Sequence, residues 1–279
     1  MRPIEVDQKT FRLPPRPRQA HKGDFGKVYI LAGSVGYTGA PVFAANGAVR
    51  TGSGLVFLGV PEEIWSVVAL KCNEAMPHPV SMEPDVVLER MSGCDAMLVG
   101  PGLGREERTV QLVQTITKRL QVPLVLDADG LYALSGQLEL LDGRIAPTVL
   151  TPHEGEFARL TGENLPIAQR TEVAAEFARA HHCVLVLKGS GTVTAAPDGR
   201  VWINTSGNPG MAKGGSGDVL AGMILSLIGQ GFPPAESAAM AVWLHGRAGD
   251  LAAQVLGEYA MTPTDLLEHL PRAILELCQ

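Results

Sequence analysis

Short apolar runs recur along the chain, and most of them are followed by a segment long enough to form a helix. Such runs are typical of strands that are buried on both faces of a sheet. Strands that alternate with helices pair in parallel through right-handed connections. The sequence therefore predicts a single-domain α/β fold, in which a mostly parallel central sheet is covered by helices on both faces. The predicted strands are residues 27–32, 55–60, 96–99, 124–126, 148–150 and 184–187.

Two other segments of the chain show different patterns. Residues 193–196 and 201–203 flank Pro-Asp-Gly-Arg, which predicts a hairpin. Residues 1–26 are rich in Pro, Arg and Lys without a period, so we expect an arm that lies over the domain and outside the sheet. We assign residues 1–20 to this arm and 21–279 to one domain, because no repeat or change of composition divides them. The expected helices include residues 41–50, 219–228, 234–256 and 264–277.

Composition and charge limit which classes of ligand or macromolecule the protein can bind. The chain has 279 residues, 46% of them hydrophobic, which is enough for one large globular domain. Its net charge of −6 argues against a nucleic-acid or anionic-membrane surface, so the positive charge that a phosphorylated ligand needs must be local. The sequence shows no membrane-spanning apolar stretch, no signal peptide and no CxxC spacing among its four cysteines. We expect a cytoplasmic protein with reduced thiols.

The unusual polar and glycine-rich motifs each follow a predicted strand. In parallel α/β sheets, ligands bind outside the carboxyl ends of the strands, which all meet at one edge. We therefore expect these motifs to converge on one rim of the sheet. They are residues 33–39, 100–104, 127–130, 151–156 and 188–192.

A further glycine-rich loop, Gly-Gly-Ser-Gly-Asp at 214–218, opens an apolar helix. Glycines let backbone N–H groups converge, and a helix N-terminus attracts anions. Asp218 is unusual there, because a carboxylate beside an anion site is repelled by the ligand unless it has a task such as accepting a proton. We expect Asp218 to be a catalytic base. The alternative is that Asp218 only caps the helix.

Other candidate site residues allow both a functional and a structural interpretation. Asp127 and Asp129 lie two apart in an extended segment, where they suit hydrated magnesium or a substrate hydroxyl, or else a turn or helix cap. Lys188 is either a phosphate-facing cation or a surface lysine. His245 lies on an apolar helix and is expected to be a satisfied core residue. The sequence contains no P-loop motif, and residues 100–104 spell GxGxG, which differs from the dinucleotide motif GxGxxG.

Six ordered motifs together resemble one family, the ADP-dependent (S)-NAD(P)H-hydrate dehydratases of the ribokinase-like superfamily. No single motif is decisive, but their order and spacing are specific, and they cover nearly the whole chain after about residue 21. The motifs are LAGSVGYTGA at 31–40, VGPGLG at 99–104, LDADGL at 126–131, TPHEGEFARL at 151–160, LKGSGT at 187–192 and NPGMAKGGSGDVLAG at 208–222.

The resemblance implies roles for individual residues. The hydrated nicotinamide nucleotide is expected at Ala40, Gly102, Gly104 and His153, and Asp218 matches the catalytic carboxylate. The adenine nucleotide is expected at Lys188, Gly189, Ser190, Gly191, Thr192 and Gly217, with an anion hole formed by Gly214, Gly215, Ser216 and Gly217. Glu156 is expected to hold magnesium through water, because His153 to Glu156 stand at the NxxE motif of the wider superfamily. Here His replaces the Asn of that motif, as is usual for this branch, and Ser216 stands where Thr is common.

The resemblance also implies a reaction: Asp218 accepts the proton of the C6 hydroxyl of NADH or NADPH hydrate, and the hydroxyl oxygen takes the β-phosphoryl group of ADP. Elimination then gives NADH or NADPH, phosphate and AMP, so the expected cofactors are ADP and Mg²⁺. An NAD(P)H-hydrate epimerase elsewhere is the expected functional partner of a stand-alone dehydratase, and a homotetramer is a form known in the family. The alternatives are a vitamin-precursor kinase of the same superfamily, such as hydroxyethylthiazole kinase, and a non-catalytic nucleotide-binding protein.

Overall fold

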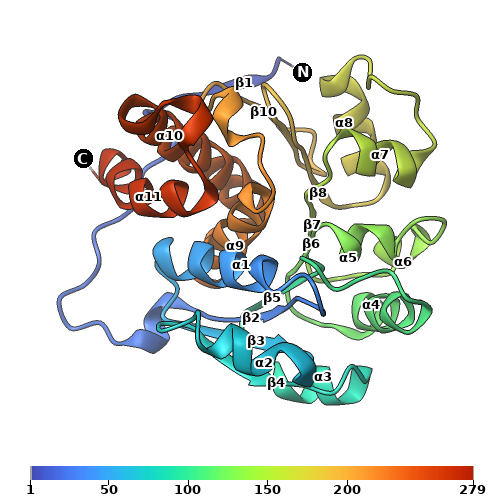
Figure 1. Ribbon diagram of the computed structural model, residues 1–279. Coiled ribbons are helices and arrows are strands. Elements are labelled where there is room, and N and C mark those ends of the chain that lie inside the picture. Colours follow the sequence, from blue (N-terminus) through green and yellow to red (C-terminus); the bar gives the residue numbers. More distant parts are fainter. Residues whose placement is uncertain (1, 279) are drawn as a thin grey trace.

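A computed structural model describes residues 2–278 and shows one ten-stranded sheet between two layers of helices (Figure 1). The strand order is β1-β10-β9-β8-β7-β6-β5-β2-β3-β4. All neighbouring strands are parallel except that β9 is antiparallel to both β8 and β10, which confirms the predicted hairpin. The strands are β1 (Ile4–Val6), β2 (Lys27–Leu31), β3 (Leu55–Val60), β4 (Met76–Pro79), β5 (Ala96–Val99), β6 (Leu124–Leu126), β7 (Thr148–Leu150), β8 (Val184–Leu187), β9 (Val193–Ala195) and β10 (Val201–Asn204).

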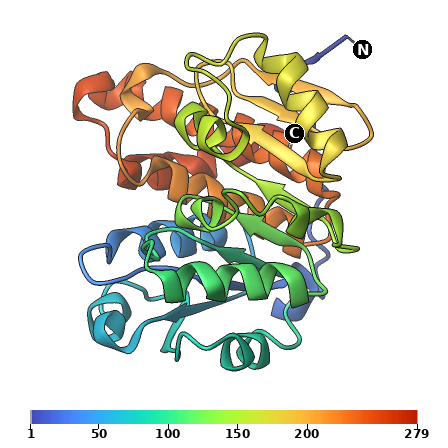
Figure 2. The ribbon, with the colours of Figure 1, turned by 90° about the vertical axis from the view of Figure 1, so that its right-hand side faces the viewer.

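The helices divide between the two faces. On one face lie α1 (Gly39–Arg50), α2 (Glu62–Ala69), α9 (Ser216–Gly229), α10 (Pro234–Ala260) and α11 (Pro263–Leu277). On the other lie α3 (Pro84–Arg90), α4 (Glu107–Arg119), α5 (Asp129–Tyr132), α6 (Glu139–Asp142), α7 (Glu154–Thr161) and α8 (Arg170–Ala180), and Figure 2 looks onto this second face. Two short 3-10 helices, η1 (Lys22–Phe25) and η2 (Pro209–Met211), complete the set for residues 2–278.

Strand β2 shows why the sequence favours a sheet covered on both faces. Val28 and Ile30 belong to the core beneath α1 and α9, whereas Tyr29 and Leu31 belong to the opposite core. All four side chains are completely buried, because successive residues of a strand point to opposite faces. A continuous apolar run therefore supplies both cores, and the predicted three-layer α/β architecture is confirmed.

Helices α1 and α9 pack so closely that backbone touches backbone. A Cβ atom added to Gly222 would lie 1.9 Å from the Ala44 carbonyl oxygen, and one added to Gly47 would lie 2.4 Å from the Val219 carbonyl oxygen. Each helix therefore presents a glycine to the backbone of the other. This reciprocal contact fixes the position of the N-terminus of α9 relative to α1.

We expect Gly222→Ala to destabilise the protein by about 3 kcal/mol, because the new methyl group meets a carbonyl oxygen that cannot move without shifting α1. The measurement is the urea midpoint at constant m-value. Gly143→Ala is the matched control, because a Cβ at Gly143 meets no atom within 4 Å and this glycine has a negative φ of −84°. Equal midpoint shifts for the two variants would contradict this account of the helix contact.

The predicted arm is partly wrong, because its beginning belongs to the sheet. Strand β1 pairs in parallel with β10, with Ile4 opposite Trp202, and Val6 is buried. The rest of the arm lies over the domain, where Leu13 N–H donates to the Leu277 carbonyl and Arg16 donates to the Gly52 carbonyl at 2.6 Å. A three-residue strand is too short to show a period, so the sequence pattern alone does not indicate it.

Candidate functional site

The motifs after the strands do converge on one rim. Gly33 N–H donates to the Pro101 carbonyl at 2.8 Å, and the Ser34 hydroxyl donates to the Gly102 carbonyl at 2.7 Å, so the first two loops are joined. Further along the rim, Lys188 N–H donates to the Pro152 carbonyl at 2.8 Å. These contacts link the ends of β2, β5, β7 and β8, as expected for parallel strands.

The loop at residues 100–104 carries two of the residues predicted on the hydrate side, Gly102 and Gly104, and lies against a third, Ala40. Its three glycines all have left-handed φ angles: Gly100 135°, Gly102 64° and Gly104 84°. A Cβ at Gly102 would lie 2.9 Å from the Cβ of Tyr37 and 3.1 Å from that of Ala40. Ala40 and Gly102 are therefore neighbours, and Tyr37 is a further neighbour that the motif comparison did not single out.

The expectation that Asp127 and Asp129 share one side of an extended segment is wrong. Ala128 between them has a φ of 51°, and Asp129 begins α5. The Asp129 carboxylate turns toward the glycine loop, where it accepts Gly104 N–H at 2.9 Å and Arg105 Nε–H at 2.8 Å. Asp129 therefore holds the loop at residues 100–104, while Asp127 belongs to a different cluster.

Lys188 lies in a cluster of carboxylates. Its Nζ is 2.8 Å from Asp127 Oδ1 and 3.9 Å from Glu156 Oε2. Asp127 is 2% exposed and also accepts the Thr151 hydroxyl at 2.8 Å. Burial lowers the pKa of Lys188, but the charges of Asp127 and Glu156 outweigh this effect and raise its pKa, so the ammonium stays charged. Lys188 is therefore a paired cation at the site, and the alternative of a surface lysine is wrong.

The segment at residues 188–192 is a tight turn held by an arginine that the sequence motifs did not indicate. The Thr192 hydroxyl donates to the Gly189 carbonyl at 2.9 Å and accepts Gly189 N–H at 3.2 Å. Arg170 at the start of α8 donates to the Ser190 carbonyl at 2.8 Å and to the Leu187 carbonyl at 2.9 Å. An isolated arginine at the start of a helix carries no sequence signal, because its role depends on which loop packs beside it.

The glycine loop at 214–217 lies at the N-terminus of α9 as predicted. Gly215 has a φ of 101°, and a Cβ there would lie 2.8 Å from the Phe43 ring. A Cβ at Gly217 would lie 3.4 Å from Lys188 Nζ, so the loop and the carboxylate cluster adjoin. Lys213 holds the loop from outside by donating to the Tyr259 carbonyl at 2.8 Å and to the Met261 carbonyl. The first N–H groups of α9 face the rim, where they attract anions.

Asp218 lies in the first turn of α9 and is half-buried. Within residues 2–278 no side-chain hydrogen bond caps this end of the helix, which contradicts the alternative that Asp218 serves only as a cap. Burial raises the pKa of Asp218 to about 7, and the charge of Asp127 adds to this rise, while Lys188 opposes it. A carboxylate with a pKa near neutrality is suited to accept a proton from a substrate hydroxyl.

His153 and Glu156 form the N-terminal cap of α7. His153 Nδ1 accepts Glu156 N–H at 3.2 Å, and Glu156 accepts His153 N–H at 2.9 Å. The other ring nitrogen of His153, Nε2, lies 3.6 Å from Glu156 Oε1. The His153 side chain is 60% exposed on the rim and so remains accessible to a ligand.

His245 on α10 is buried as expected, at 8% exposure. Burial lowers its pKa to about 4, so the ring is neutral near pH 7. Its Nε2 atom has no hydrogen-bond partner among residues 2–278, so the expectation of a satisfied core histidine is wrong on this point.

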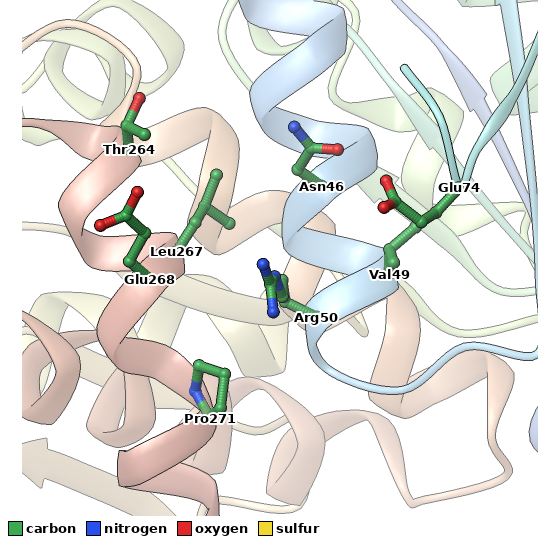
Figure 3. A pocket seen from close by; sticks show the side chains of 8 residues that line it. All are labelled: Asn46, Val49, Arg50, Glu74, Thr264, Leu267, Glu268 and Pro271. Atoms are coloured by element: carbon green, nitrogen blue, oxygen red, sulfur yellow. The ribbon is translucent and has the colours of Figure 1, made fainter. Parts of the chain in front are cut away.

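A groove on the surface is lined by residues other than those predicted for the site. It has a volume of about 490 Å³ and lies between α1 and α11, with Asn46, Arg50, Thr264 and Glu268 among its lining residues (Figure 3). All of its lining residues differ from the predicted site residues. Arg50 ends α1, whereas Ala40 lies in the first turn of that helix, about 15 Å away at the usual helical rise. The groove thus lies beside the far end of α1.

The fold is that of the ribokinase-like superfamily. A ribokinase-like superfamily protein from Enterococcus faecalis superposes on the chain with a TM-score of 0.86, at 29% identity over 99% of this chain and 96% of that chain. A family model described as NAD(P)H-hydrate dehydratase matches residues 28–272. The chain belongs to the NAD(P)H-hydrate dehydratase family, and the resemblance of its motifs is confirmed.

Two relatives illustrate this membership. The bifunctional NAD(P)H-hydrate repair enzyme Nnr of Moorella thermoacetica is 46% identical in an alignment of 277 positions that covers 95% of this chain and 52% of that protein. The chain thus spans about half the length of the curated relatives it matches. The crystal structure of ADP/ATP-dependent NAD(P)H-hydrate dehydratase from Bacillus subtilis, co-crystallised with ATP/Mg²⁺, is 33% identical with a TM-score of 0.85 and 95% of both chains covered. No helix in residues 2–278 has the length and apolar character needed to cross a membrane.

Proposed function

We propose that the chain catalyses the ADP-dependent dehydration of (S)-NADH hydrate and (S)-NADPH hydrate. The observation that carries the proposal is the position of Asp218, whose pKa is raised to about 7 in the first turn of α9, beside the glycine loop. A base and an anion-binding helix end at one place suit phosphoryl transfer to a hydroxyl. Family membership favours this reaction over the kinase alternative.

The reaction balances in two stages. Asp218 accepts the proton of the C6 hydroxyl, whose oxygen forms a bond to the β-phosphorus of ADP while the bond from that phosphorus to the bridging oxygen breaks and AMP leaves. The lone pair of the ring nitrogen then expels phosphate from C6, and loss of a proton from C5 restores the double bond of NADH or NADPH. The N–H groups of Gly214 to Gly217 stabilise negative charge during the transfer.

The two ligands take different parts of the rim in this proposal. The hydrate lies against Ala40, Gly102, Gly104 and His153, and ADP lies along residues 188–192 with its phosphates at Gly217. The support is geometric, because Gly217 directly precedes Asp218 and a Cβ atom at Gly217 would lie 3.4 Å from the Lys188 ammonium. The alternative of a non-catalytic nucleotide-binding protein leaves the raised pKa of Asp218 without a role.

Magnesium fits this site only together with the nucleotide. No group of three His, Cys, Asp or Glu side chains in residues 2–278 is arranged to hold a metal ion by itself. Glu156 is 8% exposed and caps α7 while it faces Lys188, so it suits contact through water. Bound with the phosphate oxygens, Mg²⁺ would neutralise charge on the transferring group. The Bacillus subtilis relative was co-crystallised with ATP/Mg²⁺, which supports this requirement.

An assay with NADH hydrate tests the proposed function directly. Protein, Mg²⁺ and the hydrate are mixed with ADP or with ATP, and the return of absorbance by reduced nicotinamide is followed together with AMP and phosphate. We expect recovery of NADH with one AMP and one phosphate per turnover in the presence of ADP. Absence of recovery together with ATP-dependent phosphorylation of hydroxyethylthiazole would establish the kinase alternative instead.

We expect the rate constant kcat/KM for the hydrate to fall about tenfold per pH unit below pH 7, because only ionised Asp218 accepts the proton. Asp127→Asn removes a neighbouring negative charge that raises the pKa of Asp218. In this variant the acid limb of the pH profile, where kcat/KM falls with decreasing pH, should therefore move to lower pH. A full pH profile of both proteins measures this. An acid limb that stays in place in the variant would show that Asp127 does not act on the base.

The remaining features of the proposal concern partners. Relatives such as the Moorella protein are named bifunctional repair enzymes and are about twice as long as this chain. This supports cooperation with an epimerase that interconverts the two epimers of the hydrate. The homotetramer and the cytoplasmic location remain predictions. Sedimentation of the purified protein checks the first of them.

A further inference from the structure

A cluster of positive charge lies on the rim just outside the hydrate side of the site. The guanidinium carbon of Arg105 is 4.9 Å from the centre of the Tyr132 ring, and that of Arg159 is 5.8 Å from the same centre. Two cations therefore share one aromatic ring, as guanidinium groups do when they stack. Helices α5 and α7, which carry Tyr132 and Arg159, pack side by side in Figure 1.

The chain connects this cluster to the predicted substrate residues on both sides. Arg105 directly follows Gly104, and its Nε donates to Asp129, the residue that also holds Gly104 N–H. Arg159 follows Glu156 by three positions on α7, so both side chains project from the same face of that helix. The charge of Glu156 also contributes to the raised pKa of Arg105, although the hydrogen bond to Asp129 is the main cause.

The two arginines differ in whether a carboxylate already pairs with them. Arg105 is half exposed and paired with Asp129 at 2.8 Å. Arg159 is exposed, and the ion pairs among residues 2–278 do not include it. A guanidinium group that lies on an aromatic ring keeps its N–H edge free, and this edge matches the oxygens of a phosphate. Arg159 is therefore a cation with open donors.

The distribution of charge on the rim indicates what the positive charge of Arg159 could bind. Asp127, Glu156 and Asp218 make the centre acidic, the chain carries a net charge of −6, and Lys188 is paired with Asp127. A hydrated dinucleotide carries phosphates beyond its reacting ring, and these need positive charge outside the acidic centre. The order β8, β7, β6, β5 places Arg105, which follows β5, three strands away from Lys188, which follows β8, whereas Arg159 lies on α7 after the intervening strand β7.

We propose that Arg105 and Arg159, which both lie near the Tyr132 ring, form a subsite for a phosphate of the hydrated dinucleotide. This inference rests on the proposed function, because it takes the ring of that substrate to lie at Gly102 and Gly104. It assigns the adenosine half of the hydrate to the surface over α5 and α7, whereas ADP binds on the β8 side.

The test is Arg159→Gln, because Arg159 makes no ion pair with the described part of the chain, residues 2–278, whose loss would disturb the fold. We expect the KM for NADH hydrate to rise roughly three- to tenfold, with kcat and the KM for ADP changed by less than about twofold. Arg90→Gln is the matched control, since Arg90 is also exposed and its removal changes the net charge equally. Arg90 ends α3, which leads into the amino end of β5, so it lies at the edge of the sheet opposite the rim.

A truncated substrate locates the effect. The hydrate of reduced nicotinamide mononucleotide lacks the adenosine half and its phosphate, so Arg159→Gln should not lower its kcat/KM. An unchanged KM for NADH hydrate, an equal loss with both hydrates, an equal effect of Arg90→Gln, or a raised KM for ADP would each overturn the subsite. If the wild-type protein restores no NADH at all, the proposed function itself fails, and this outcome is distinct from an active enzyme that is indifferent to the variant.

Discussion

Asp218→Asn is expected to lower kcat for hydrate repair by about a thousandfold or more. The amide cannot accept the proton of the C6 hydroxyl, and general bases contribute roughly 10²- to 10⁴-fold to such steps. The side chain keeps its size and its place in the first turn of α9, so binding of ADP should change little. Steady-state kinetics with NADH hydrate, together with ADP titration by calorimetry, measure both effects. Near-normal turnover by a folded variant would remove Asp218 from the mechanism.

The same variant should be more stable than the wild type in alkaline solution. The pKa of Asp218 is about 7 in the folded protein and about 3.9 in an unfolded chain, so the folded protein binds the proton more tightly. The stability that this proton contributes is complete below about pH 4 and is lost as the pH rises to about 7. Asparagine avoids this loss, so we expect Tm to rise roughly 2–6 °C at pH 8 and to change little at pH 4. A Tm difference that is independent of pH would contradict the raised pKa.

Lys188→Met is expected to destabilise the protein by about 3 to 5 kcal/mol and to abolish activity. The variant leaves the Asp127 carboxylate, which is 2% exposed, without the cation that lies 2.8 Å from it. Removing one member of a buried ion pair is costly because the remaining charge stays in a poorly solvated place. The free energy of unfolding from urea titration at pH 8 measures the loss.

A second substitution separates this cause from a simple loss of packing. In Lys188→Met/Asp127→Asn the unpaired charge is gone, so we expect at least half of the lost stability to return while the activity stays absent. Asn retains an oxygen that accepts the Thr151 hydroxyl, which preserves the other contact of Asp127. If the effects of the two single substitutions simply add, then the ion pair contributes little to stability.

The sequence predicted the centre of the sheet better than its edges. Strands such as β2 and β5 are buried on both faces and therefore appear as continuous apolar runs. Edge strand β4 reads Met-Pro-His-Pro, and its prolines suit an edge but hide it from any apolar pattern. Edge strand β1 was assigned to the arm because a three-residue strand in a Pro- and Arg-rich segment has no period. Its pairing depends on β10, which lies about 200 residues later in the chain.

For the site, the sequence indicated which loops meet but could not indicate how their side chains pair. The position of a loop follows from strand order, so the convergence of the rim was predictable. The partners of Lys188 and Asp129 depend on rotamers and on the turn at Ala128, and a spacing of two residues does not reveal them. Arg170 and Lys213 hold the loops at residues 188–192 and 214–217 through backbone carbonyls. Such contacts leave no pattern in the sequence, because every residue offers a carbonyl.

The interlocked glycines of α1 and α9 also limit how this chain can evolve. Ala40 and Asp218 stand at the N-termini of these two helices, and the helices touch through backbone atoms at Gly47 and Gly222. Substitution of neighbouring side chains cannot slide one helix past the other. The distance between the N-termini of α1 and α9 should therefore stay constant as the sequence changes. A new substrate preference would have to arise in the loops above these helices, around residues 33–38 and 100–105.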